Sequence, residues 1–149
     1  MSIEYINRWH HAARPEPTER DFNVQLGCHL EEVAEMLADL RFQTAGFADL
    51  DGKDTVLYSG LTLFADRLKR GDCTATIMDR ANFLKELCDQ VVTATGVAYC
   101  AGMDFPPAMN EVDTSNWSKF DADGKPVRDE HGKIMKSEHY QAPNLRGLY

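Results

Sequence analysis

The chain has 149 residues, 43% hydrophobic and 27% charged, a composition that supports the core of one globular domain. This excludes a disordered acidic tail, a collagen and a disulfide-rich miniprotein. The 24 acidic residues outnumber the 16 basic ones and give a formal net charge of −8. That charge disfavours binding to a nucleic acid polymer and favours a site that attracts divalent cations.

The cysteines and the N-terminal segment indicate the cellular setting. None of the four cysteines forms a CxxC pair, so a zinc site is not expected and free thiols of a reducing cytosol are the simplest interpretation. Residues 1–17 contain no apolar signal segment, and no apolar run approaches the ~20 residues of a membrane span. We therefore expect a cytoplasmic protein that does not bind membranes.

Two helices are expected in the first 40 residues. Residues 2–13 form a short helix with Ser2 as its N-cap, and it ends before Pro15. A second helix begins after Thr18 and runs to about residue 40. Apolar residues recur along it with the spacing of one buried face: Leu26, Leu30, Val33, Leu37 and Leu40.

Two more helices follow a break. Gly46 and residues 49–54 end or separate the first region. A third helix covers 56–70, with Gly71 after it, and a long fourth helix covers roughly 79–103. The fourth helix has small or apolar residues on both sides, so we expect both sides to be covered.

The last third of the chain changes in character. Prolines at 106–107 start a short helix through Val112. After Trp117, two Gly-Lys turns at Gly124 and Gly132 indicate short strands or a loose hairpin. The two turns are too short to count as an internal repeat.

Two pairs of acidic residues stand out on the expected helices. Glu32 and Glu35 are three residues apart, as are Glu86 and Asp89, so each pair shares one helical face. Two such helices can place four carboxylates around one point, where oxygen ligands suit a hard cation such as Mg²⁺. The alternative is a solvated helix face, and it is strongest for Glu35, which lies opposite the apolar stripe of its helix.

These acidic residues occur in segments that resemble a known family. HLEEVAEML (29–37) and KELCDQVVTATG (85–96) resemble the EExxE and ExxD motifs of the all-α nucleoside triphosphate pyrophosphohydrolases. That superfamily includes MazG-like proteins, dimeric dUTPases and phosphoribosyl-ATP pyrophosphohydrolase. The segment SNWSKFDADGKPVRDEHGKIMK (115–136), followed by HYQAPNL (139–145), is similar to the C-terminal segment of phage and bacterial MazG-like proteins.

The resemblance implies a fold and an assembly. The fold is all-α, a helical bundle of the MazG or dimeric dUTPase type with a short irregular or β-hairpin C-terminal segment. Residues 1–149 form a single domain, with the tail from about 115 to 149 closing over the site. The resemblance also implies a homo-oligomer, either a dimer or a tetramer, located in the host cytoplasm if the protein is phage-encoded.

The resemblance also implies an activity that depends on Mg²⁺, with Mn²⁺ as a possible substitute. A nucleoside triphosphate, with (d)GTP as first candidate, is cleaved between its α- and β-phosphates to a monophosphate and pyrophosphate. By position, the metal ligands are Glu32, Glu35, Glu86 and Asp89. Glu35 is the first candidate for the catalytic base, and Glu31 is the second catalytic candidate.

The tail would supply the substrate-binding groups, because acidic residues cannot hold a triphosphate themselves. Of the chain's 16 Lys and Arg residues, five fall within residues 119–136. The expected substrate-binding residues are Asn116, Lys119, Lys133, Lys136 and Tyr140. One feature departs from the family: the gap between Glu35 and Glu86 is longer than usual and holds the helix over 56–70.

Two alternative functions remain open. The chain could be a non-catalytic helical scaffold or regulatory oligomer, although such a protein has no need of four clustered carboxylates. Phosphoribosyl-ATP hydrolysis is a further alternative, but that branch of the superfamily is shorter and lacks this long tail.

Overall fold

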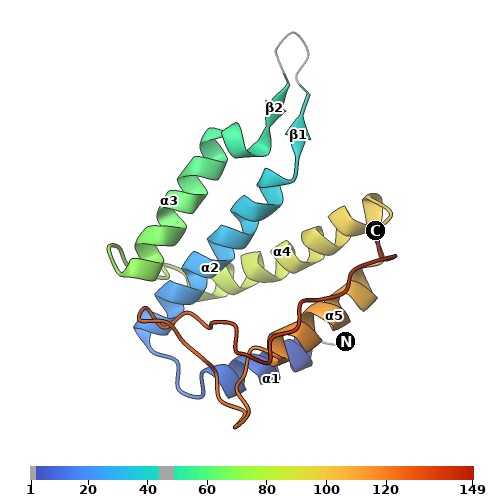
Figure 1. Ribbon diagram of the computed structural model, residues 1–149. Coiled ribbons are helices and arrows are strands. Elements are labelled where there is room, and N and C mark those ends of the chain that lie inside the picture. Colours follow the sequence, from blue (N-terminus) through green and yellow to red (C-terminus); the bar gives the residue numbers. More distant parts are fainter. Residues whose placement is uncertain (1–2, 44–48) are drawn as a thin grey trace. The chain divides into compact units, whose positions relative to one another are not determined.

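The computed structural model describes residues 3–43 and 49–149, so the expected N-cap Ser2 and the break at Gly46 lie outside the described residues. The described residues form five α-helices, which confirms the prediction of a mainly helical fold (Figure 1). They are α1 (Ile3–Ala13), α2 (Glu19–Ala38), α3 (Val56–Arg70), α4 (Arg80–Cys100) and α5 (Phe105–Trp117). Two short strands, β1 (Arg41–Phe42) and β2 (Leu50–Asp51), pair antiparallel and were not predicted.

The described chain forms two compact units. We call the first the tail unit; it contains α1, α4, α5 and most of the C-terminal segment, as Met1–Glu16, Thr76–Arg128 and Ile134–Tyr149. We call the second the hairpin unit; it contains α2, β1, β2 and α3, together with one turn of the C-terminal segment, as Pro17–Ala75 and Asp129–Lys133. No described helix is both long and apolar enough to cross a membrane.

In the hairpin unit, local capping signals fix the helix ends. Thr18 and Asp21 cap each other at the start of α2, with both backbone-to-side-chain distances at 3.1 Å. Thr55 accepts a hydrogen bond from the Tyr58 amide at the start of α3, and Gly71 ends that helix with a φ of +85°. The predicted bounds of the helix over 56–70 are therefore confirmed.

The buried face of α2 differs from the predicted one. Its buried residues are small or polar as well as apolar: Asn23, Val24, Gly27, Ala34 and Leu37. Leu40, predicted to be buried, is exposed. The buried face contains small residues because α3 lies close along α2 (Figure 1). A Cβ on Gly27 would come within 2.8 Å of the Ala65 carbonyl oxygen.

The tail unit has a small aromatic core. Trp9, Ala13 and Phe120 are buried together, with Ile134 packed against them. The Trp9 indole also donates a hydrogen bond of 2.9 Å to the Asn116 carbonyl. This bond anchors the last turn of α5, which continues to Trp117 instead of ending near Val112 as predicted.

Two turns with the same hydrogen bonds follow α5. The Asp121 carboxylate accepts from the amides of Asp123 and Lys125 at 3.0 and 2.8 Å. The Asp129 carboxylate accepts in the same way from the amides of His131 and Lys133, both at 2.9 Å. The predicted turns are present. They repeat one geometry at a spacing of eight residues, although the two turns were predicted to be too short to form an internal repeat.

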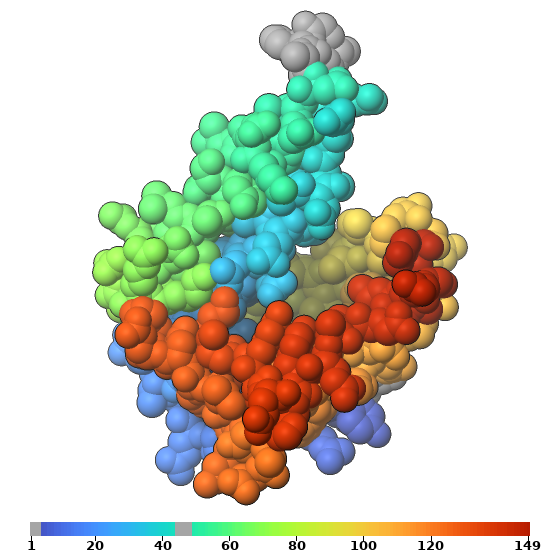
Figure 2. Space-filling model, in the orientation of Figure 1, coloured from blue at the N-terminus to red at the C-terminus, as the bar shows by residue number. Residues whose placement is uncertain are grey.

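The rest of the tail lies along α5 within its own unit. The Asp104 amide at the start of α5 donates to the Leu148 carbonyl at 2.8 Å. The Asn144 amide donates to the Glu111 carboxylate at 3.2 Å. In Figures 1 and 2 the tail, in red, accordingly follows the orange helix.

The long helix α4 is exposed over most of its length in the single chain, and the expected covering of both its sides stays a prediction. Ala98 is its one buried residue, and Phe83 and Leu87 are half-buried. Large apolar side chains on it remain exposed: Leu84, Val91, Val92, Val97 and Tyr99. Within the tail unit, α4 contacts α5.

Candidate functional site

Glu32 and Glu35 lie one turn apart on α2, in the hairpin unit. Both side chains are exposed. Neither takes part in any ion pair found between the described side chains. Two carboxylates with this spacing are neighbours on the helix surface, and their charges repel until a cation binds between them.

Glu86 and Asp89 lie one turn apart on α4, in the tail unit. The ammonium group of Lys85 lies 3.1 Å from Glu86 and 2.6 Å from Asp89. Both acidic side chains are 52% exposed in the single chain. The hydrogen bonds to Asp89 and then to Glu86 raise the pKa of Lys85 and keep it protonated beside them.

Each unit thus contains one pair of carboxylates. In the part of the chain that the structure describes, no group of three or more His, Cys, Asp or Glu side chains is gathered for a metal ion. The cluster of four carboxylates therefore stays a prediction. The donor set itself fits Mg²⁺: the donors are all oxygens, they are accessible to solvent, and a phosphate-bound Mg²⁺ takes only one or two protein carboxylates.

Glu31, next to Glu32 on α2, has a different environment. Its carboxylate binds the ammonium groups of Lys69 at 2.6 Å and Lys133 at 2.8 Å, all within the hairpin unit. Partial burial raises the pKa of Glu31, but the hydrogen bonds and charges of Lys133 and Lys69 outweigh it and hold this pKa below its ordinary value. Glu31 is therefore a fixed anion between two cations.

Four of the five expected substrate-binding residues lie in adjoining segments of the tail unit. The Lys119 ammonium binds the Asn116 side-chain oxygen at 2.8 Å, and the Lys136 ammonium lies 4.5 Å from the centre of the Tyr140 ring. Hydrogen bonds from Ser137 to the Ser118 carbonyl and from the Gln141 amide to the Ser118 hydroxyl join the two segments. The fifth residue, Lys133, belongs to the hairpin unit and binds Glu31.

Lys69 and Lys85 were not among the predicted site residues. The spacing of Lys85 and Asp89, four residues apart on one helix, was a readable signal for their ion pair. Lys69 carried no such signal, because its contact with Glu31 joins two helices 38 residues apart in the chain.

Comparison of the chain with family models, with curated proteins and with solved structures found no match.

Proposed function

We propose that the protein is an Mg²⁺-dependent nucleoside triphosphate pyrophosphohydrolase that converts a (d)NTP to its monophosphate and pyrophosphate. The observation that carries this proposal is the state of the two acid pairs. Both lie on long helices with their carboxylates accessible to solvent, and Glu32 and Glu35 have no cation among the described ion pairs. A pair of carboxylates in this state is ready to bind a metal ion.

Glu32, Glu35, Glu86 and Asp89 would hold the Mg²⁺ ions. Bound Mg²⁺ would neutralise phosphate charge and lower the pKa of water, which makes water a better nucleophile. Until then Lys85 offsets only part of the charge of Glu86 and Asp89, and its ion pairs are exposed and therefore weak. A divalent cation can displace such an ammonium group.

The reaction needs a proton acceptor as well as a metal. Water adds to the α- or the β-phosphorus, the bond from that phosphorus to the bridging oxygen breaks, and the monophosphate and pyrophosphate separate. We assign the proton of the attacking water to Glu35. Glu31, our second catalytic candidate, is a poorer acceptor because two ammonium groups already hold its carboxylate in the ionised form.

The tail would bind the substrate's phosphates. Lys119 and Lys136 supply point charges for the β- and γ-phosphates, and Asn116 and Tyr140 hold these two ammonium groups in place. The resemblance to MazG-like proteins makes (d)GTP our first choice of substrate.

We also propose that the protein works as a homodimer or homotetramer. The exposed apolar side chains of α4 have no cover within the tail unit, and several exposed apolar side chains on one helix are typical of a surface that binds another protein. A second copy of the chain would cover it.

The test is an activity panel. The purified protein is incubated with each of the eight common nucleoside and deoxynucleoside triphosphates and Mg²⁺, and the products are separated. We expect a monophosphate and pyrophosphate in equal amounts from at least one substrate, and no turnover when Mg²⁺ is chelated. Release of orthophosphate and a diphosphate would contradict the proposed cleavage site. No turnover of any nucleotide would favour a non-catalytic oligomer.

A further inference from the structure

The turn Asp129–Lys133 belongs to the hairpin unit, while the chain on both sides of it belongs to the tail unit. Its two ends are anchored in the tail unit. The Arg128 guanidinium donates a hydrogen bond to the Ala13 carbonyl, and Ile134 packs against the buried cluster of Trp9, Ala13 and Phe120. The five residues Asp129–Lys133 are therefore the only part of the described C-terminal segment that is assigned to the hairpin unit.

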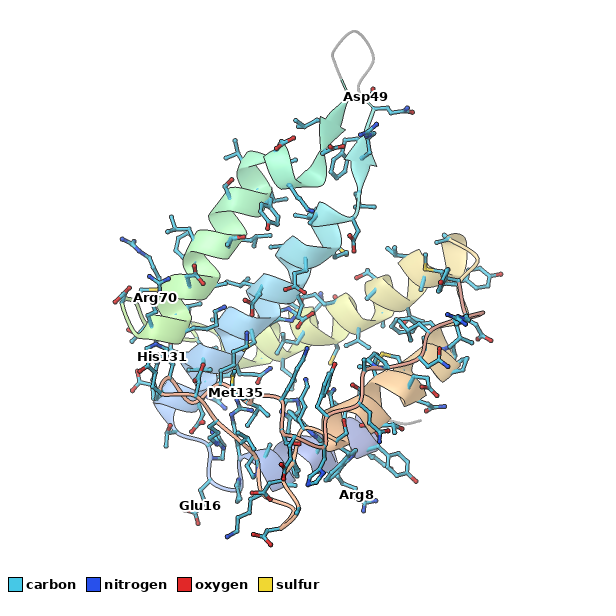
Figure 3. All side chains as sticks on the ribbon, in the orientation of Figure 1. Arg8, Glu16, Asp49, Arg70, His131 and Met135 are labelled. Atoms are coloured by element: carbon cyan, nitrogen blue, oxygen red, sulfur yellow. The ribbon has the colours of Figure 1, made fainter. Side chains whose placement is uncertain are left out.

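One ion-pair cluster holds the turn on the helices. The Lys133 ammonium lies 2.8 Å from one oxygen of Glu31, and the Lys69 ammonium lies 2.6 Å from the other. Lys69 is only 13% exposed, so this cluster is partly shielded from solvent. Figure 3 shows the turn, labelled at His131, beside the end of α3, labelled at Arg70.

The preceding turn provides an internal comparison. Asp121 and Asp129 organise their turns with the same pair of hydrogen bonds, and a lysine occupies the same place in each, Lys125 in the first and Lys133 in the second. Lys125 takes part in no ion pair between described side chains. The turn geometry therefore forms without an ion pair, and the ion pair of Lys133 adds a restraint that the first turn lacks.

We propose that Glu31 and Lys133 form an ionic latch that holds the turn Asp129–Lys133 on the α2–α3 hairpin. The aspartate-centred turn presents the lysine in a fixed direction, and Lys69 fixes the carboxylate that receives it. The latch restrains the turn within the hairpin unit, and its loss would loosen the turn. This inference does not depend on the proposed enzymatic activity.

The test compares two matched variants of the full-length protein, Lys133→Met and Lys125→Met. Backbone amide exchange is measured by NMR in both turns, with circular dichroism to check that helix content is unchanged. We expect Lys133→Met to speed exchange at residues 131–133 about five- to tenfold, since a partly shielded ion pair has opened, and to leave residues 123–125 unchanged. Lys125→Met should leave residues 131–133 unchanged.

Salt provides a second measurement on the same proteins. Raising the NaCl concentration screens the ion pair, so exchange at residues 131–133 should rise in the wild type and stay constant in Lys133→Met. Lys133→Met is preferred to a change at Glu31 because it keeps the Glu31–Lys69 pair intact. The latch is refuted if the two lysine variants have the same effect on residues 131–133, or if salt changes exchange equally in the wild type and in Lys133→Met.

Discussion

His10 is half-buried on α1, with its ring 4.9 Å from the centre of Trp9. Burial, and then the positive charge of Arg14, disfavour the imidazolium form and hold the pKa of His10 below its ordinary value. The unfolded chain lacks both effects, so it binds a proton at His10 more readily than the folded chain does.

This difference predicts a pH dependence of stability. A lowered folded-state pKa gives stability that is present above the ordinary histidine value of about 6.5, and that stability is lost as the pH falls below it. We expect His10→Gln to flatten the decline of the unfolding free energy between pH 7 and pH 5, measured by urea denaturation. The exposed neighbour His11 is the control, and an equal flattening in His11→Gln would contradict the assignment.

Lys119 gives a kinetic prediction. Its ammonium is held by Asn116 near the start of the tail, where we place the substrate's phosphates. In Lys119→Ala we expect KM to rise about tenfold, equivalent to about 1.4 kcal/mol of binding free energy, with Mg²⁺ affinity in the absence of nucleotide unchanged. Steady-state kinetics and calorimetry check the two parts. The exposed Lys53 supplies the control variant Lys53→Ala, and an unchanged KM in Lys119→Ala would remove Lys119 from the site.

At the scale of elements, the contact between α2 and α3 depends on Gly27. A Cβ there would meet the Ala65 carbonyl oxygen at 2.8 Å and the Leu68 Cβ at 3.3 Å. Gly27→Ala gains about 1 kcal/mol of helix propensity but overpacks the contact at a cost of about 1–3 kcal/mol. We expect a net loss of stability of about 1 kcal/mol.

Gly60 on α3 is the matched control, since a Cβ there would meet nothing within 4 Å. Gly60→Ala should therefore stabilise the protein by about 0.5–1 kcal/mol through helix propensity alone. Thermal or urea unfolding of both variants tests the pair. Stabilisation by both substitutions would contradict the close approach of α2 and α3 at Gly27.

The elements also show what the sequence could and could not predict. The bounds of α3 were predictable because Thr55 and Gly71 cap it locally, and the two tail turns were predictable from their Asp and Gly residues. The buried face of α2 was not, because the approach of α3 to Gly27 decides it. The length of α5 likewise depends on a hydrogen bond from distant Trp9.

The candidate site, like the fold, could be predicted from the sequence only in part. Spacing along a helix identified each carboxylate pair and would also have identified Lys85 beside Asp89. Spacing could not show that Glu31 is held by Lys69 and Lys133, because those contacts join segments 38 and 102 residues apart. Contacts of that range depend on tertiary structure.

At the scale of the whole molecule, α4 predicts self-association. Val92, 69% exposed, lies in the middle of its apolar surface. We expect light scattering to give two or four times the 16.8 kDa chain mass for the wild type. Val92→Lys should weaken association at least tenfold, about 1.4 kcal/mol, because it places a charge in the interface.

Val56 is the control for this prediction, because it is 90% exposed but lies at the start of α3 in the hairpin unit. Val56→Lys should leave the mass unchanged. A wild-type mass of 16.8 kDa at every concentration, with full activity, would contradict the oligomer.

The proposed hydrolysis requires both acid pairs, so the turnover of Glu32→Gln and of Glu86→Gln decides whether the proposal holds. Each change keeps the shape of the side chain and removes one charge, so we expect turnover of the best nucleotide to fall about 10²–10³-fold. The metal-free variants should be at least as stable as the wild type, because like charges repel less. Glu138→Gln, at a side chain 84% exposed outside both motifs, should keep wild-type turnover. Near wild-type turnover in both Glu32→Gln and Glu86→Gln would mean that the acid pairs are only solvated helix faces, and would contradict the proposed enzyme.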